Sequence, residues 1–266
     1  MGKLAAALAA ASAVVGLGLS SVSAGTEKIP KAMPGEAAEV TETAATTHAG
    51  EPDYTLLVLG GQTVKWGEGR AGAGAVVRYA FVTNEAERPG AINCRTMTPI
   101  GDHLLHSDLR ESDFAQELRR AMDDWSIVAD IRFQPASDPA TADLLIGGDK
   151  DAHGIAYADV TRAKTPEKGF AAISRAAICF NLTLAWENRF DGDVATPNVR
   201  YVAAHELGHV LGLDHAWGRD KLMRFQYDER FQSPQPGDIA GAAFLYGRRP
   251  AATGSYALIR DLPTKR

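Results

Sequence analysis

The pattern of hydrophobic and polar positions predicts a folded domain that begins near Tyr54. From this residue on, short runs rich in β-branched and aromatic side chains alternate with glycine-rich stretches, which is typical of strands and turns. Helical patterns lie between and after these runs. The runs that we interpret as strands are residues 54–60, 75–83, 129–135, 142–148, 153–160 and 176–182.

Three segments have the spacing of helices. In residues 112–128, apolar side chains recur every three or four positions, and Ser112 is the expected N-cap. The other two helices are each bounded by a capping residue and a glycine. These boundaries are Thr196 and Pro197 before a helix over 197–211 that Gly212 ends, and Asp238 before a helix that ends at Gly247.

The first 24 residues are typical of a secretory signal peptide. Lys3 precedes an apolar run, and the small residues Val22 and Ala24 form a cleavage site. A membrane anchor is the alternative interpretation, but the run is rich in alanine, glycine and serine and ends at that site. We therefore expect export to the periplasm or the extracellular space, with no stable membrane anchor after cleavage.

The remaining chain divides into three parts. Residues 25–53 lack aromatic side chains and periodicity, so we expect a linker or a short pro-segment there. Residues 54–247 are expected to form one domain, and residues 248–266 a flexible tail.

Composition narrows the range of partners. The chain has 266 residues with a net charge of -5 and an isoelectric point near 5.8. Such a balance provides no basic surface of the kind that holds a phosphate backbone, so nucleic acid is not an expected partner.

Two cysteines, Cys94 and Cys179, are the only ones in the sequence. In an exported chain such a pair is first interpreted as a disulfide. Two buried free thiols are the alternative, because pairing cannot be deduced from sequence.

The stretch "HELGHVLGLDH" carries the candidate chemistry. His205 and His209 are four residues apart, so their imidazoles project from one helical face and can share a zinc ion. Gly212 can adopt a positive φ, end the helix and let the chain return His215 as a third ligand. Three imidazoles leave a fourth position for water, which is the arrangement of a catalytic zinc site.

Glu206 adjoins the first ligand and is the expected general base. It would take a proton from a zinc-bound water and pass it to the leaving amine. The alternative is a buried helix with satisfied core histidines. The extended spacing H-E-x-x-H-x-x-G-x-x-H argues against it, since a core helix does not explain the glycine and third histidine in register.

With these residues the sequence resembles the metzincin zinc peptidases. Within them it is similar to the matrixins, the group of the matrix metalloproteinases and their bacterial relatives, and we expect a matrixin of the bacterial type. Met223 lies where matrixins carry the methionine of the turn beneath the metal, and Tyr227 matches a tyrosine that walls their specificity pocket. "DIAGAAFLYG" is similar to the end of the matrixin domain.

The resemblance implies an α+β fold. It implies a twisted, mixed, five-stranded sheet with one antiparallel edge strand and three helices. The expected edge strand is "GIAYADV", Gly154 to Val160, and in such enzymes this strand binds an extended peptide by strand addition.

The sequence differs from the matrixin pattern at several positions, and the family's properties are not assigned to those positions. Phe225 replaces the tyrosine of other metzincin branches, and Arg224-Phe225 replaces the family's proline, which changes the pocket. Tyr157 stands where a histidine of a second zinc site would fall. The pro-segment has no "PRCGxPD" switch. Asp191 and Asp193 in "DGD" could ligate calcium, although a plain turn is favoured.

Two functions follow from these expectations. The first is a secreted, monomeric zinc endopeptidase with one catalytic zinc ion and a protein or peptide substrate. The second is a secreted zinc-containing binding or scaffold protein with little or no turnover. The presence of Glu206 favours the first, since a pure binder needs no base beside the metal.

Overall fold

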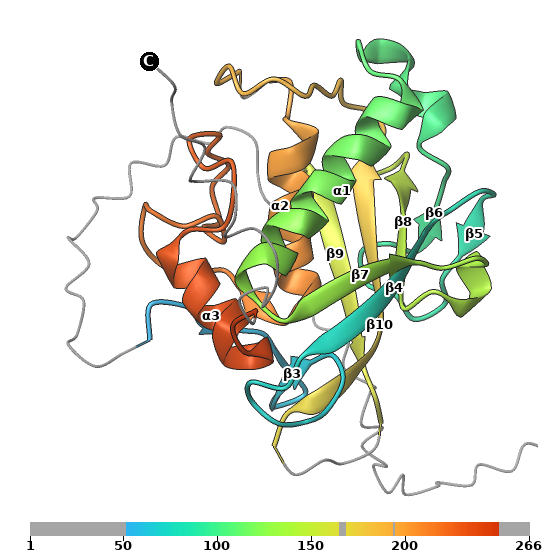
Figure 1. The fold of residues 1–266 in the computed structure, drawn as a ribbon. Helices are drawn as coiled ribbons and strands as arrows, with labels where there is room; N and C mark the ends of the chain where they lie inside the picture. Colours follow the sequence, from blue (N-terminus) through green and yellow to red (C-terminus); the bar gives the residue numbers. More distant parts are fainter. Residues whose placement is uncertain (1–51, 165–168, 194, 250–266) are drawn as a thin grey trace, which may run out of the picture.

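The computed structural model describes residues 52–164, 169–193 and 195–249. They form a mixed sheet with helices packed on it (Figure 1). The helices are α1 (Glu111–Val128), α2 (Val199–Val210) and α3 (Pro236–Tyr246), with short 3-10 segments η1 (Gly101–His106) and η2 (Pro139–Thr141). The strands are β1 (Thr55–Leu56), β2 (Val58–Leu59), β3 (Gln62–Lys65), β4 (Ala75–Phe81), β5 (Ala86–Glu87), β6 (Thr96–Met97), β7 (Ile131–Pro135), β8 (Leu144–Asp149), β9 (Ala156–Arg162), β10 (Ala171–Asn181) and β11 (Leu213–Asp214).

Five strands form the body of the sheet, in the order β7-β4-β8-β10-β9. The first four run parallel to one another, and β9 pairs antiparallel with β10 at the edge. The predicted mixed sheet, its antiparallel edge strand and the α+β class are thereby confirmed. The sheet has seven strands rather than five, because the hairpin of β2 and β3 pairs with the beginning of β10.

Helices α1 and α2 lie side by side over one face of the sheet (Figure 1). The Nε1–H of Trp125 on α1 donates to the carbonyl oxygen of Ala204 on α2 at 2.8 Å. Trp125 has no exposed surface. Since burying an aromatic ring of this size stabilises a core by several kcal/mol, this contact fixes the position of α2 relative to the rest of the domain.

All three predicted helices are present, but their predicted N-caps are wrong. Ser112 lies inside α1, whose N-cap is Arg110. The cap of α2 is Asn198 rather than Thr196, and Pro197 lies outside the helix. Asp238 is the third residue of α3, and its carboxylate accepts from the backbone N–H of the actual cap, Gln235. In α1 the carboxylate of Asp113, three positions after the cap, likewise accepts from the backbone N–H of Arg110.

Alternation along β10 separates two apolar layers. Ile178 and Phe180 belong to the main core beneath the helices, whereas Cys179 faces a smaller cluster on the other side of the sheet. There Cys179 forms a disulfide with Cys94, with the two Cα atoms 5.8 Å apart. The backbone N–H of Cys94 also donates to Asp159 of β9 at 3.2 Å. The disulfide thus ties the segment before β6 to β10, and the bond to Asp159 ties it to the edge strand β9.

Replacing both Cys94 and Cys179 by alanine is expected to lower the free energy of unfolding by about 4 kcal/mol, because the cross-link closes a long loop in the unfolded chain. Urea denaturation of the oxidised protein measures the effect. Adding a reductant to the natural chain should reproduce the loss and leave the double variant unaffected. Equal stabilities of the oxidised protein and the variant would contradict this account.

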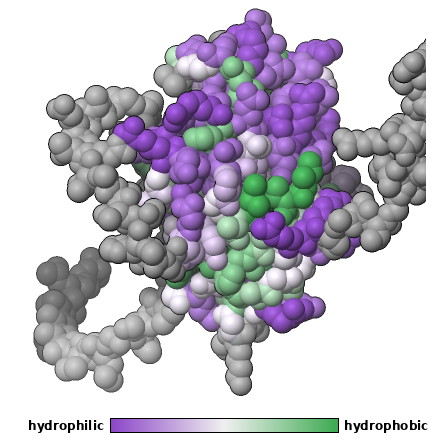
Figure 2. Space-filling model, turned by 60° about the vertical axis from the view of Figure 1, so that its left-hand side comes forward, coloured by the Kyte–Doolittle hydropathy of each residue, from purple (hydrophilic) through white to green (hydrophobic). Residues whose placement is uncertain are grey.

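The predicted signal peptide (1–24), nearly all of the predicted linker (25–53) and most of the predicted tail (248–266) lie outside the described residues, so these boundaries stay predictions. Within the described ranges, no helix is both long and apolar enough to cross a membrane. On the face shown in Figure 2, hydrophilic residues cover most of the upper part and apolar residues gather below the middle.

Candidate metal centre

Helix α2 presents His205, Glu206 and His209 to a cleft beside β9. The helix begins at Asn198, whose side-chain oxygen accepts from the backbone N–H of Tyr201 at 3.0 Å. Nearly every residue of α2 is buried. A helix buried on almost every side cannot slide or rotate, so the two histidines are held in place by the surrounding core.

Gly212 redirects the chain after α2, as predicted. It has a φ of 96°, and a Cβ there would collide with the carbonyl oxygen of Val64, so both the conformation and the space require glycine. The following strand β11 pairs antiparallel with β1 near the start of the described chain. This pairing supports the segment that brings His215 back over the helix.

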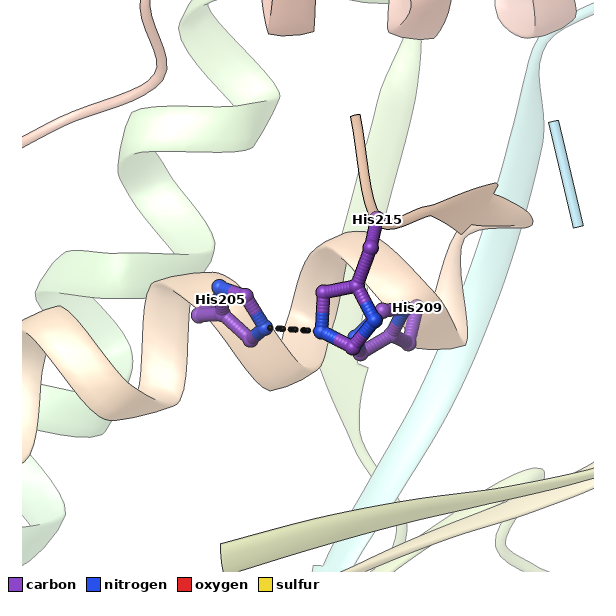
Figure 3. A group of neighbouring side chains, drawn as sticks. All are labelled: His205, His209 and His215. Atoms are coloured by element: carbon purple, nitrogen blue, oxygen red, sulfur yellow. Dashed lines mark hydrogen bonds between the residues drawn. The ribbon is translucent and has the colours of Figure 1, made fainter. Parts of the chain in front are cut away.

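The three histidines converge (Figure 3). His205 and His209 extend from α2, and His215 extends from the chain just after β11. The Nε2 atoms of His205 and His215 are 3.2 Å apart, and one nitrogen of each of the three rings lies within 4.8 Å of the others. Two nitrogens bound to a tetrahedral zinc at its usual bond length would be about 3.3 Å apart.

Hydrogen bonds on the far side of two rings determine which nitrogen faces the centre. Nδ1 of His205 lies 2.8 Å from the carbonyl oxygen of Leu222, and Nδ1 of His209 lies 2.9 Å from that of Leu213. A carbonyl only accepts, so each Nδ1 carries the proton and each Nε2 presents a lone pair. Nε2 of His209 is buried and has no hydrogen-bond partner among the described residues. Converging lone pairs without a donor fit a bound cation.

Burial keeps the imidazoles neutral. Desolvation lowers the pKa of His205 and of His215 to about 4 each, with the neighbouring His215 adding to the effect at His205. The pKa of His209 is also lowered well below its usual value by burial. A neutral imidazole is the form that binds a metal ion, so the cluster is ready to bind zinc at neutral pH.

Glu206 lies beside the histidines and is 7% exposed. Burial raises the pKa of its carboxyl to about 8, opposed by a hydrogen bond from the backbone N–H of Ala158 on β9. Its Oε2 atom has no hydrogen-bond partner among the described residues. Oε2 is therefore the oxygen that can exchange a proton in the cleft.

Met223 lies directly beneath α2 and is 1% exposed. Its turn is held by the buried carboxylate of Asp238, which accepts from the backbone N–H of Leu222 at 2.7 Å and from that of Met223 at 3.2 Å. Met223 packs so closely on the helix that a Cβ on Gly208 would collide with its Sδ atom and lie 3.2 Å from the ring of Trp125. Gly208 therefore allows the turn to approach the two helical ligands.

Replacing Gly208 by alanine tests this packing. Helix propensity alone favours alanine by about 1 kcal/mol, but overpacking against Met223 costs about 1–3 kcal/mol. Since the collision involves a side chain enclosed by the core, we expect the variant to unfold at lower urea concentration and to bind zinc more weakly. A variant as stable as the natural protein would show that the turn can move away without cost.

A cavity of about 460 Å³, including its open mouth, lies beside the histidines. Tyr227 and Phe225 line it, as does Arg224. The hydroxyl of Tyr227 accepts from the backbone N–H of Asn198 at 2.7 Å and donates to Glu229. The structure thus places Tyr227 in the pocket wall and ties it to the first turn of α2.

Three further positions singled out in the sequence are Asp191, Asp193 and Tyr157. The carboxylate of Asp191 accepts from the backbone N–H of Asp193 at 3.1 Å, and that of Asp193 accepts from Ala195 at 2.9 Å, as in a plain turn. Tyr157 packs against the apolar cluster around the disulfide and also lines the cavity beside the histidines. Within the described part of the chain, the one group of candidate metal ligands is His205, His209 and His215, so none of these three positions belongs to it.

Sequence reasoning did not find the contacts that support the site. Asp238 carries a capping pattern, yet its bonds to the turn at Leu222 and Met223 join segments about fifteen residues apart. The bond between Tyr227 and Asn198 likewise spans 29 positions. No local pattern predicts the bond between Tyr227 and Asn198. For Asp238 there was a signal, because an acidic residue at the start of a helix near the methionine turn can accept from the backbone of that turn.

The fold and the three-histidine centre define a zinc-dependent metallopeptidase domain of the zincin type. Comparison with known proteins agrees with this class. The Matrixin family model matches residues 103–247, more than half of the chain. The chain belongs to the matrixin family, whose members use a catalytic zinc ion.

Individual relatives share about three residues in ten. The hatching enzyme of Paracentrotus lividus is 32% identical over 152 residues, which are 54% of this chain and 24% of that protein. Metalloendoproteinase 4-MMP of Arabidopsis thaliana is 28% identical over 166 residues, 59% of this chain and 46% of the relative. Matrilysin of Mus musculus is 31% identical over 153 residues, 54% of each chain. The chain therefore spans between about a quarter and about half of the length of these relatives.

Proposed function

We propose that this protein is an exported zinc-dependent endopeptidase that hydrolyses peptide bonds in extended protein or peptide segments. The observation that carries the proposal is the convergence of His205, His209 and His215 beside the buried carboxylate of Glu206. The matrixin family match supports it.

We assign the three histidines as the ligands of one zinc ion and Glu206 as the general base. When bound, zinc supplies Lewis-acid chemistry, since it makes a water molecule more acidic and stabilises negative charge on a carbonyl oxygen. Glu206 accepts the proton that the attacking water loses and donates it to the leaving amine. Oε2, which has no hydrogen-bond partner among the described residues, is the oxygen that would exchange the proton.

The substrate is expected to bind in extended form along β9. Among the described residues this strand pairs only with β10, so its outer edge can accept a further strand. Tyr227 and Phe225 then wall the pocket for the side chain that follows the scissile bond. Met223 supports the metal ligands from below and takes no part in proton transfer.

Export after removal of a signal peptide, a monomeric state and the bacterial type of matrixin belong to the same proposal. Export rests on the pattern of residues 1–24, and a disulfide between Cys94 and Cys179 fits an oxidising compartment.

Incubation of the purified protein with casein and with a quenched peptide library tests the proposal. We expect cleavage that stops when a zinc chelator is added and resumes when zinc is restored. Cleavage that survives removal of zinc would contradict the proposed site. A folded, zinc-loaded protein that cleaves none of the substrates would instead favour a zinc-containing binding or scaffold protein.

A further inference from the structure

Arg224 is one of the residues that line the pocket. It follows Met223 directly and lies with Tyr201 and Tyr227 around the same cavity. Only 17% of its side chain is exposed. A guanidinium keeps its charge when it is buried, so the pocket contains a permanent positive charge in addition to its aromatic walls.

The hydrogen bonds of Arg224 leave part of the guanidinium without an acceptor. Nη1 donates to the carboxylate of Asp228 at 2.7 Å, and Nη2 lies 3.4 Å from the side-chain oxygen of Gln226. The Nε atom is buried and has no hydrogen-bond partner among the described residues. A buried donor without an acceptor is unfavourable. Nε is enclosed, so the long bond of Nη2 to Gln226 is the one that a stronger acceptor from a ligand can replace.

The charge on Arg224 is only partly neutralised. Asp228 also forms an ion pair with Arg230 at 2.6 Å, so two guanidinium groups share one carboxylate. Glu206, next to the metal ligands, is the one acidic side chain among the residues that line the pocket. Among the described residues that line the pocket, Arg224 is the one with a permanent positive charge, and Glu229 lies behind Tyr227.

The guanidinium is also held in place. Its partner Asp228 is fixed through its backbone N–H, which donates to the hydroxyl of Tyr201 on α2 at 3.1 Å. The ion pair between Arg224 and Asp228 closes a short loop over four residues. A group that is already ordered loses little entropy when it binds a ligand, so Arg224 is suited to selecting a substrate side chain.

We propose that Arg224 is a specificity-determining residue and that the pocket selects aspartate or glutamate at the position after the scissile bond. This inference rests on the proposed function. A carboxylate that enters the pocket is attracted to the charge of Arg224 and can replace Gln226 as the acceptor of Nη2, whose present bond of 3.4 Å is long. A leucine of similar size leaves the charge without this partner.

The test measures kcat/KM for peptides that differ only at the residue after the cut. We expect the natural protein to prefer aspartate or glutamate over leucine by at least about 10-fold. Arg224→Leu should reverse the preference by lowering cleavage of acidic peptides and raising cleavage of leucine peptides. Arg224→Lys, which keeps the charge, should retain part of the preference for acidic residues. Arg70→Leu is the matched control, since Arg70 is exposed and lies outside the pocket lining, and it should keep the acidic preference.

A second readout separates this inference from the proposed function. The zinc-loaded Glu206→Gln variant, with and without Arg224→Leu, is titrated with the same fluorescent peptides, and anisotropy reports binding without turnover. Tighter binding of acidic peptides that depends on Arg224 supports the inference even if the natural protein cleaves nothing. Two results would overturn the role of Arg224 without contradicting the proposed peptidase activity. One is a preference of the natural protein for apolar residues after the cut, and the other is a preference that Arg224→Leu leaves unchanged.

Discussion

Replacing Glu206 by glutamine is expected to reduce kcat for peptide cleavage by about 10²- to 10⁴-fold. Glutamine has the same shape and can still accept from the backbone N–H of Ala158, but it cannot take a proton from the attacking water. Zinc content and KM should change little, because the three imidazoles are untouched. Steady-state kinetics together with metal analysis of the purified variant measure both quantities.

Glu85→Gln serves as the control for this substitution. Glu85 is an exposed partner of Lys150, with 58% of its side chain accessible, and it lies outside the pocket lining. Its variant should keep full activity. A Glu206→Gln variant that cleaves at the natural rate would refute the assignment of Glu206 as the base, and loss of zinc from it would point instead to a structural role.

Replacing His215 by alanine is expected to weaken zinc binding by at least about 100-fold and to abolish cleavage. His215 follows β11 and is not part of α2, so its removal leaves the helix and its packing in place. The two remaining imidazoles cannot complete a tetrahedral site at neutral pH. Competition of the variant with a zinc-binding dye gives the affinity, and circular dichroism verifies that the fold is retained.

His153→Ala is the matched control, because His153 is exposed and lies outside the histidine cluster. Unchanged zinc affinity is expected for it. If His215→Ala bound zinc as tightly as the control, the third ligand would have to be another residue.

The sequence predicted the elements whose signals are local. The mixed sheet, its antiparallel edge strand and the three helices followed from short apolar runs, helical spacing and the resemblance to matrixins. The return of His215 followed from one glycine, because few residues other than glycine adopt the φ of 96° found at Gly212. Spacing alone was therefore enough to bring three histidines to one point.

The features that the sequence did not predict depend on contacts between segments far apart in the chain. The start of α2 was placed two residues too early, because Thr196 and Pro197 form a good local capping pattern, whereas Asn198 becomes the cap through bonds that include the hydroxyl of Tyr227. The position of Arg224 in the pocket depends in the same way on Asp228 and on the tyrosine that anchors it. Such pairs form only when the chain is folded, and one sequence carries no sign of them.

A zinc titration of the stripped protein tests the central claim most directly. The full chain is freed of metal with a chelator, dialysed, and titrated with zinc while cleavage of a quenched peptide is followed. The account predicts no cleavage without metal and full recovery at one equivalent of zinc, with no recovery in the His215→Ala variant. Cleavage by the metal-free protein, or recovery of the variant at one equivalent, would contradict the claim that His205, His209 and His215 hold one zinc ion required for peptide hydrolysis.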